Sequence, residues 1–396
     1  MSQLTARSTS RSRLIRRGPG PRRPGRLWTA WRGNDRGAAS ILVAMVLGFG
    51  VLLGTASMVV DVGQLYFERE QLQSGADSAA LGIARHCAAN PANCSAQAST
   101  AKNLANANAA DDGRTGVTTI CGTGQGLPAC PKQMDGVGAC LGTPPNGAPY
   151  VEVRTATELP SGSTLLPPTF AQTMINGYQG RTVHACARAS WSAAESAVTK
   201  AIMFSTCEWA KVTNNGKNLY PTPSEQAPQK SWETVFHQHE GATAAAPGCA
   251  GYGPSVPGGY GWLPHTASKC HTNVKAGDTY TAKKTSDAEK DCTGGLSASV
   301  DKQLVLTVAI YDTVSNSGPD LKYHVVGLTG FVVTGFHFAN ADKPSSIPGG
   351  GCGSNDNVCT GSERCIYGYF THTVLTGGDG TYTGTNYGAS VIVGAG

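Results

Sequence analysis

The longest apolar stretch of the chain lies near its N-terminus. Residues 38–60 contain no charged side chain, and Arg36 and Asp61 bound the stretch on its two sides. As a helix, these 23 residues would be about 34 Å long, which is enough to cross about 30 Å of hydrocarbon. A cleaved signal peptide normally has a shorter apolar region, followed by a small-residue cleavage site. We therefore expect a retained transmembrane helix at 37–60.

A helical pattern continues beyond the apolar stretch, over residues 61–89. Apolar or small residues recur there at roughly heptad spacing, and Pro91 ends the pattern. This seam consists of Leu65, Leu72, Ala76, Ala79 and Ile83. Gly75 and Ala80 keep the same side thin, so another helix could approach closely. A helix that packs on its own domain has the same pattern, and periodicity does not separate the two arrangements.

Segments typical of strands follow in the C-terminal part of the chain. Alternating or continuous apolar positions occur at 151–155, 183–191, 304–311, 323–338 and 366–375. Residues 90–147 are expected to form a Cys/Gly-rich loop segment, and 212–300 a long loop insertion. The predicted fold class is α+β: a long N-terminal membrane-spanning helix followed by a mostly β, disulfide-tied extracytoplasmic domain over 148–396.

Charge is unevenly distributed along the chain. Residues 1–37 hold ten Arg and a single acid, Asp35, whereas the rest of the chain holds 21 basic and 25 acidic residues. Basic residues flank the cytoplasmic side of membrane helices. We therefore expect 1–36 to be a disordered cytoplasmic tail that touches anionic lipid, with the C-terminal domain outside the cell membrane. Nucleic acid is not expected as a partner, because aromatic residues do not interleave with the Arg run.

All 13 cysteines follow the apolar stretch. Outside a membrane this distribution predicts a disulfide framework. The spacing favours two neighbouring pairs, Cys87 with Cys94 and Cys270 with Cys292. Disulfides are also expected for Cys352, Cys359 and Cys365, whereas Cys121, Cys130 and Cys140 could pair in several ways.

No motif predicts an active site. The G-x-S-x-G elbow is absent, and S-x-x-K at Ser99 and Ser299 lacks the partner motifs of a serine acyl-transfer site. His237 and His239 could offer two imidazoles to zinc, but a third ligand would have to come from elsewhere, such as His265 or His271. A solvated loop is therefore favoured. We expect a non-enzymatic protein without catalytic, cofactor-binding or metal-binding residues.

The residues around the apolar stretch resemble a known family signature. After Arg36-Gly37 and the apolar run, the pattern D-x-G-x-L-Y-x-x-R-x-x-L-Q-x-x-A-D-x-A-A-L extends from Asp61 to Leu81. In order, spacing and position around a membrane span, residues 36–88 are similar to the N-terminal signature of the TadE/TadG-like family of the tight-adherence (Flp) pilus-assembly system. The Glu that marks prepilin-peptidase processing in pilin-like members of that system is absent from this apolar run.

The resemblance implies a TadG-like, membrane-anchored component of Flp pilus assembly that acts through helix–helix packing and an outward β domain. Its partners would be membrane lipid and other pilus-assembly or pseudopilin-like membrane proteins, and an oligomer is compatible with the same surface. The implied interaction residues are Asp61, Gly63, Leu65, Tyr66, Arg69, Leu72, Ala76, Asp77, Ala79 and Ala80, with Asp61 at the membrane exit. The alternatives are a membrane-tethered surface binder or adhesin outside a pilus and, third, an exported enzyme.

Overall fold

The computed structural model divides the chain into two compact units, residues 1–56 and residues 57–396. The expected basic tail lies almost entirely outside the described residues. The structure describes residues 36–90, 94, 97–109, 114–132, 136–144, 146–238, 258–266, 270–315, 320–350, 359, 361–375, 380–381 and 384–395.

Helix α1 (Arg36–Ala89) is an uninterrupted helix of 54 residues. It begins at the apolar stretch and includes the whole extension that the heptad pattern predicts. Within the described part of the chain, it is the one helix long and apolar enough to cross a membrane. Large apolar side chains from Ile41 to Val60 are exposed, whereas those on one face from Leu72 onward are buried. The two halves of α1 therefore have different surroundings.

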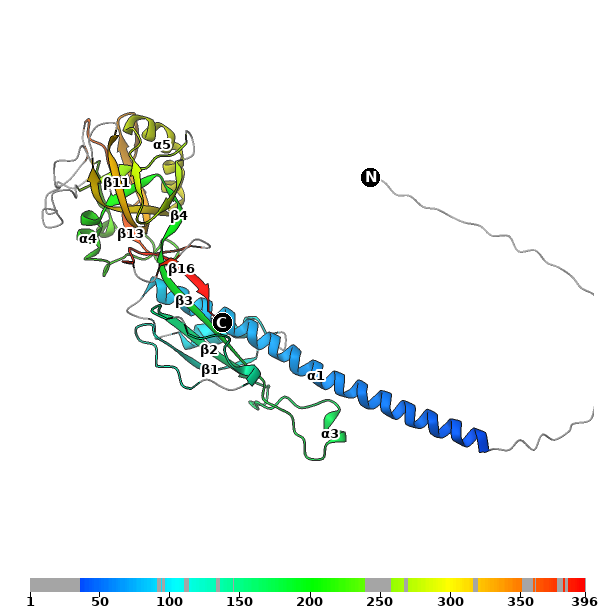
Figure 1. Cartoon of the computed structure of the whole chain (residues 1–396). Helices are drawn as coiled ribbons and strands as arrows, with labels where there is room; N and C mark the ends of the chain where they lie inside the picture. Colours follow the sequence, from blue (N-terminus) through cyan, green and yellow to red (C-terminus); the bar gives the residue numbers. More distant parts are fainter. Residues whose placement is uncertain are drawn as a thin grey trace, which may run out of the picture. The chain divides into compact units, whose positions relative to one another are not determined.

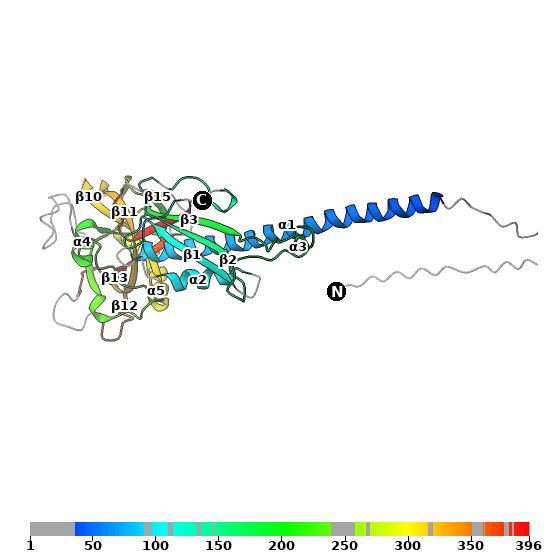
Figure 2. The same cartoon turned by 90° about the horizontal axis from the view of Figure 1, so that it is seen from below.

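A six-stranded sheet packs on the C-terminal part of α1 (Figures 1 and 2). Its first three strands are antiparallel neighbours, and the C-terminal end of the chain supplies the others. The alternation expected at 151–155 places Val151 and Val153 on the face toward the helix. The strand order is β1 (Thr115–Gly122), β2 (Tyr150–Thr157), β3 (His184–Ala194), β16 (Ala389–Gly394) and β14 (Thr373–Leu375), with β15 (Gly380–Thr381) paired to β3.

An eight-stranded sheet forms a second core. Its strand order is β6 (Thr234–His237), β13 (Cys365–Thr371), β11 (Lys322–Phe338), β10 (Val305–Ser315), β5 (Ile202–Ser205) and β7 (Tyr260–Trp262), with β12 (Ala341–Lys343) and β9 (Thr279–Thr281) paired to β11. Phe204, Phe236, Phe331 and Phe370 meet at its centre, with ring centroids 4.5–5.6 Å apart. The segment predicted as a strand at 304–311 coincides with the first part of β10.

Short elements connect and cover the sheets. Strands β4 (Ser196–Lys200) and β8 (His271–Lys275) form a separate pair. The remaining helices are α2 (Ala98–Ala107), α3 (Ala171–Met174), α4 (Thr206–Thr213) and α5 (Thr285–Lys302), with single 3-10 turns at Gly136–Gly138 and Lys230–Trp232.

The structure corrects two expected loop segments while it confirms the α+β fold class. Residues 90–147 contain α2 and β1, and residues 212–300 contain β6 to β9 and α5. Helix α2 escapes the sequence pattern because its buried face consists only of alanines, Ala101 and Ala105. Helix α5 likewise buries small or polar side chains beside Leu296 and Val300. Buried faces with so few large apolar side chains lack the repeated pattern by which a helix is recognised in a sequence.

The close approach of α2 to α1 gives a matched test of this packing. A Cβ added at Gly75 would lie 3.1 Å from the Ala105 carbonyl oxygen, whereas one added at Gly63 meets nothing within 4 Å. Gly75→Leu should therefore lower the free energy of unfolding by about 1–3 kcal/mol, because the extra volume has no room. Gly63→Leu, in the same helix, should leave it unchanged or raise it slightly. Chemical denaturation of the full chain in detergent measures both, and equal losses would contradict this packing.

Candidate functional site

From Leu72 onward, the small-residue seam of α1 is buried inside its own unit. Leu72, Ala76, Ala79 and Ile83 are each 1% exposed or less. The last three belong to one hydrophobic cluster with residues of β2 and β3, among them Val151, Val153, Ala187 and Ala189. The seam therefore packs on a sheet of the same chain.

The thin side of α1 also has an occupant within the chain. Gly75 approaches the backbone of α2 at Ala105, and Gly82 approaches the Leu104 side chain. The helix that packs closely against this side of α1 is therefore α2. These contacts correct the expectation that Leu72, Ala76, Ala79 and Ala80 pack laterally against other membrane helices.

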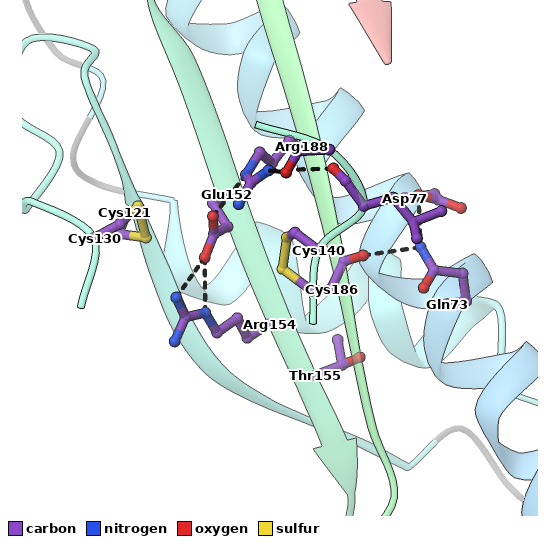
Figure 3. The surroundings of a disulfide bond; sticks show 12 residues. Gln73, Asp77, Cys121, Cys130, Cys140, Glu152, Arg154, Thr155, Cys186 and Arg188 are labelled. Atoms are coloured by element: carbon purple, nitrogen blue, oxygen red, sulfur yellow. Dashed lines mark hydrogen bonds and ion pairs between the residues drawn. A yellow bond between two sulfur atoms is a disulfide. The ribbon is translucent and has the colours of Figure 1, made fainter. Parts of the chain in front are cut away.

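Polar contacts fix the helix to the sheet in a defined register (Figure 3). Thr155 Oγ1 of β2 donates a hydrogen bond to the Leu72 carbonyl oxygen at 3.0 Å, and Gln73 Nε2 donates to the Cys186 carbonyl oxygen at 3.0 Å. The same amide nitrogen donates to Asp77 Oδ1 at 3.2 Å. Burial raises the pKa of the Asp77 carboxyl, and the hydrogen bond from Gln73 opposes that rise. Asp77 therefore orients Gln73 toward β3.

Asp61 holds a distant loop against α1. Its carboxylate accepts hydrogen bonds from the backbone N–H groups of Thr169, at 2.8 Å, Phe170 and Ala171. One turn on, Gln64 Oε1 accepts from Thr169 Oγ1 at 3.0 Å. An anionic oxygen is a strong acceptor for converging backbone donors. The residue expected to mark the membrane exit is thus also a binding point for residues more than 100 positions later in the sequence.

Other signature residues remain on the surface of the unit. Gly63 is exposed, and Leu65 is half-buried beside Tyr66, whose side chain is 66% exposed. Tyr66 and Arg69 line a groove of about 570 Å³ together with Arg181 and His184. Val62, Tyr66 and Phe67, which follow directly after the apolar stretch, are exposed apolar residues and are together called the exposed strip here. Among the exposed signature residues, these three carry the large apolar side chains nearest the apolar stretch.

A buried charge network supports the opposite face of the sheet (Figure 3). Glu152 accepts hydrogen bonds from Arg154 Nε and Arg188 Nε, both at 2.7 Å, and all three residues are buried. Arg154 also donates to the carbonyl oxygens of Pro131 and Lys132, and Arg188 to those of Leu141 and Gly142. The network therefore ties two loop segments down over β2 and β3. Strand alternation places Glu152 and Arg154 on one face, but it carries no sign of the loop that buries them.

Disulfides also hold these two loop segments and the C-terminal end of α1. The structure joins Cys87 to Cys94 and Cys270 to Cys292, the two neighbouring pairs favoured by spacing. Cys359 is bonded to Cys365, whereas Cys352 lies outside the described residues. The open set resolves into Cys121–Cys130 and Cys140–Cys186. The last pair joins residues 46 positions apart, which sequence spacing could not reveal.

The described residues offer no ready metal site. Three groups of His, Cys, Asp or Glu side chains are close enough to share an ion, and each contains two cysteines that are joined to each other. A disulfide sulfur is not the thiolate that binds zinc. His237 belongs to one group, with Cys359 and Cys365, while His265 contacts the Leu263 carbonyl oxygen instead. His239 lies outside the described part of the chain.

Comparison with protein families finds a match within the N-terminal helix. Residues 37–85 match the family described as putative Flp pilus-assembly TadE/G-like. Residues 37–85 form a TadE/G-like segment. The match confirms the resemblance and supports a role related to Flp pilus assembly and anchoring in a membrane. Searches of curated proteins and of solved structures each found no match for the chain.

Removal of the Glu152 carboxylate charge tests the buried network of Glu152, Arg154 and Arg188. Glu152→Gln leaves two buried guanidinium groups without a counter-charge, so the free energy of unfolding should fall by about 3–5 kcal/mol. Glu158→Gln is the control, since Glu158 forms an exposed ion pair with Lys102 at 3.3 Å, worth about 0–1 kcal/mol. Denaturant unfolding under oxidising conditions measures both. Similar losses in the two variants would contradict the role of Glu152.

Proposed function

We propose that the chain is a non-enzymatic, TadG-like, membrane-anchored component of Flp pilus assembly. The observation that carries this proposal is the division of the TadE/G-like segment. Its apolar half, up to Val60, exposes large apolar side chains, whereas one face of its second half, from Leu72 onward, is buried in a disulfide-tied β-rich unit. A helix divided in this way suits the attachment of a folded unit to a membrane.

Charge and cysteine placement support an orientation. The ten Arg before the apolar stretch favour a cytoplasmic N-terminus in the plasma membrane. The disulfides all lie after it, and disulfides persist in oxidising compartments. The β-rich unit is accordingly extracytoplasmic in this proposal.

The proposed partners are membrane lipid and other pilus-assembly or pseudopilin-like membrane proteins. Since the seam is occupied within the chain, these proteins contact the apolar stretch and the exposed strip, Val62, Tyr66 and Phe67. Aromatic side chains such as Tyr66 and Phe67 are enriched at protein interfaces. The same exposed surface is the one open to a second copy of the chain.

A membrane-tethered binder or adhesin outside a pilus is the second candidate. The eight-stranded sheet favours it, because its aromatic core is separate from the cluster that holds the TadE/G-like segment. In that case the helix would only tether the protein, and surface display would not depend on the pilus genes. An exported enzyme lacks comparable support from the described side chains.

In-cell photocrosslinking separates the two candidates. A photoreactive amino acid at Tyr66 or Phe67 should form adducts with pilus-assembly proteins, and these should disappear in cells that lack the pilus genes. Leu81 is the control, because it is apolar and 45% exposed but lies outside the exposed strip. An absence of protein adducts at Tyr66 and Phe67, with the protein still on the surface, would favour the tethered binder.

A further inference from the structure

The loop that Asp61 holds combines a lack of charge with exposed apolar side chains. Residues 159–180, here called the α3 loop, contain no charged side chain over 22 consecutive positions, in a chain with 14% charged residues. Apolar side chains in it are exposed: Leu165 is 41%, Phe170 43% and Ile175 58% exposed. A segment that exposes several large apolar side chains and carries no charge is suited to surroundings other than water. Figure 1 shows the loop, with α3, as an extension of the β2–β3 connection.

The position of the loop along α1 is fixed by contacts within one unit. Asp61 binds the backbone at Thr169, Phe170 and Ala171. An apolar cavity of about 350 Å³ lies between loop and helix, lined by Ser57, Met58 and Leu65 on one side and by Pro167, Pro168 and Ile175 on the other. Ser57 and Met58 belong to the last turn of the apolar stretch. The loop therefore reaches about 6 Å past Asp61 toward the apolar stretch, at about 1.5 Å per residue.

We propose that the α3 loop is a second membrane-contact element, seated in the lipid interface beside the point where α1 leaves the bilayer. This inference rests on the membrane anchor of the proposed function. The interfacial layer on each side of a bilayer is roughly 5–8 Å thick, which matches the depth that the loop reaches. The apolar cavity between loop and helix accepts a lipid acyl chain.

The backbone of the loop is suited to this location. Irregular backbone meets lipid only when its polar groups are satisfied. The Asp61 carboxylate accepts hydrogen bonds from three consecutive N–H groups, and the base of the loop is closed by paired bonds between Leu166 and Arg181. Ile175 N donates to the Ala171 carbonyl oxygen at 2.8 Å. Asp61 thus stabilises the part of the loop that lies beside the membrane.

Photocrosslinking to lipid tests the proposal at single positions. The full chain is reconstituted in phosphatidylethanolamine–phosphatidylglycerol vesicles with a photoreactive amino acid at Phe170 or Ile175. Both are exposed, so the replacement leaves the buried cores intact. Leu47 in the apolar stretch and Val198 on β4, 64% and 63% exposed, are the bilayer and water controls. We expect lipid adducts at Phe170 and Ile175 in yields comparable with Leu47, and none above background at Val198.

The controls separate the possible failures. Lipid adducts at Leu47 without any at Phe170 and Ile175 would overturn the inference and leave the membrane anchor intact. Their absence at Leu47 as well would overturn the anchor itself. Adducts at Phe170 and Ile175 with a second copy of the chain, in place of lipid, would show that the loop is a protein interface and would also overturn the inference.

Discussion

The structure depends on the close packing of small side chains of α1 against β2, β3 and α2. Alanines at 76, 79 and 80 and the glycine at 75 allow this approach, since any larger side chain would push the helix away from the sheet. The disulfide Cys87–Cys94 fixes the end of the helix, and the Thr155 and Gln73 hydrogen bonds fix its rotation. Without this contact, the TadE/G-like segment would have no defined relation to the β-rich unit.

The packing assigns two tasks to one continuous helix. The residues before Asp61 are apolar and exposed, while those from Leu72 onward belong to a folded core. The region between them carries the exposed strip and the attachment point of the α3 loop. Interaction with other molecules is therefore expected there and in the apolar stretch, since the small-residue seam from Leu72 onward is buried within the chain.

The contrast between apolar and polar positions decides how much of the fold and of the candidate site could be predicted from the sequence. Strong patterns predicted some of the elements that the structure contains. The uncharged run at 38–60 and its extension to Ala89 form α1, and the alternation at 151–155 lies in β2. The sequence could not predict what packs against the seam, because a sheet of the same chain and a second helix both require small residues there. Helix α2 was missed because it has only ten residues and its fully buried side chains are two alanines. Glu152 was placed on the correct face, but its burial depends on a loop with no periodic pattern.

Hydrogen exchange of the purified full chain in detergent, without partners, tests the central claim most directly. If the seam packs within the chain, backbone amides of residues 72–88 should exchange far more slowly than those of 62–70. They should also open together with the amides of β2 and β3, because they form one core. Rapid exchange at 72–88 in the isolated chain, with protection only when other pilus-assembly proteins are added, would show instead that the seam belongs to an intermolecular interface.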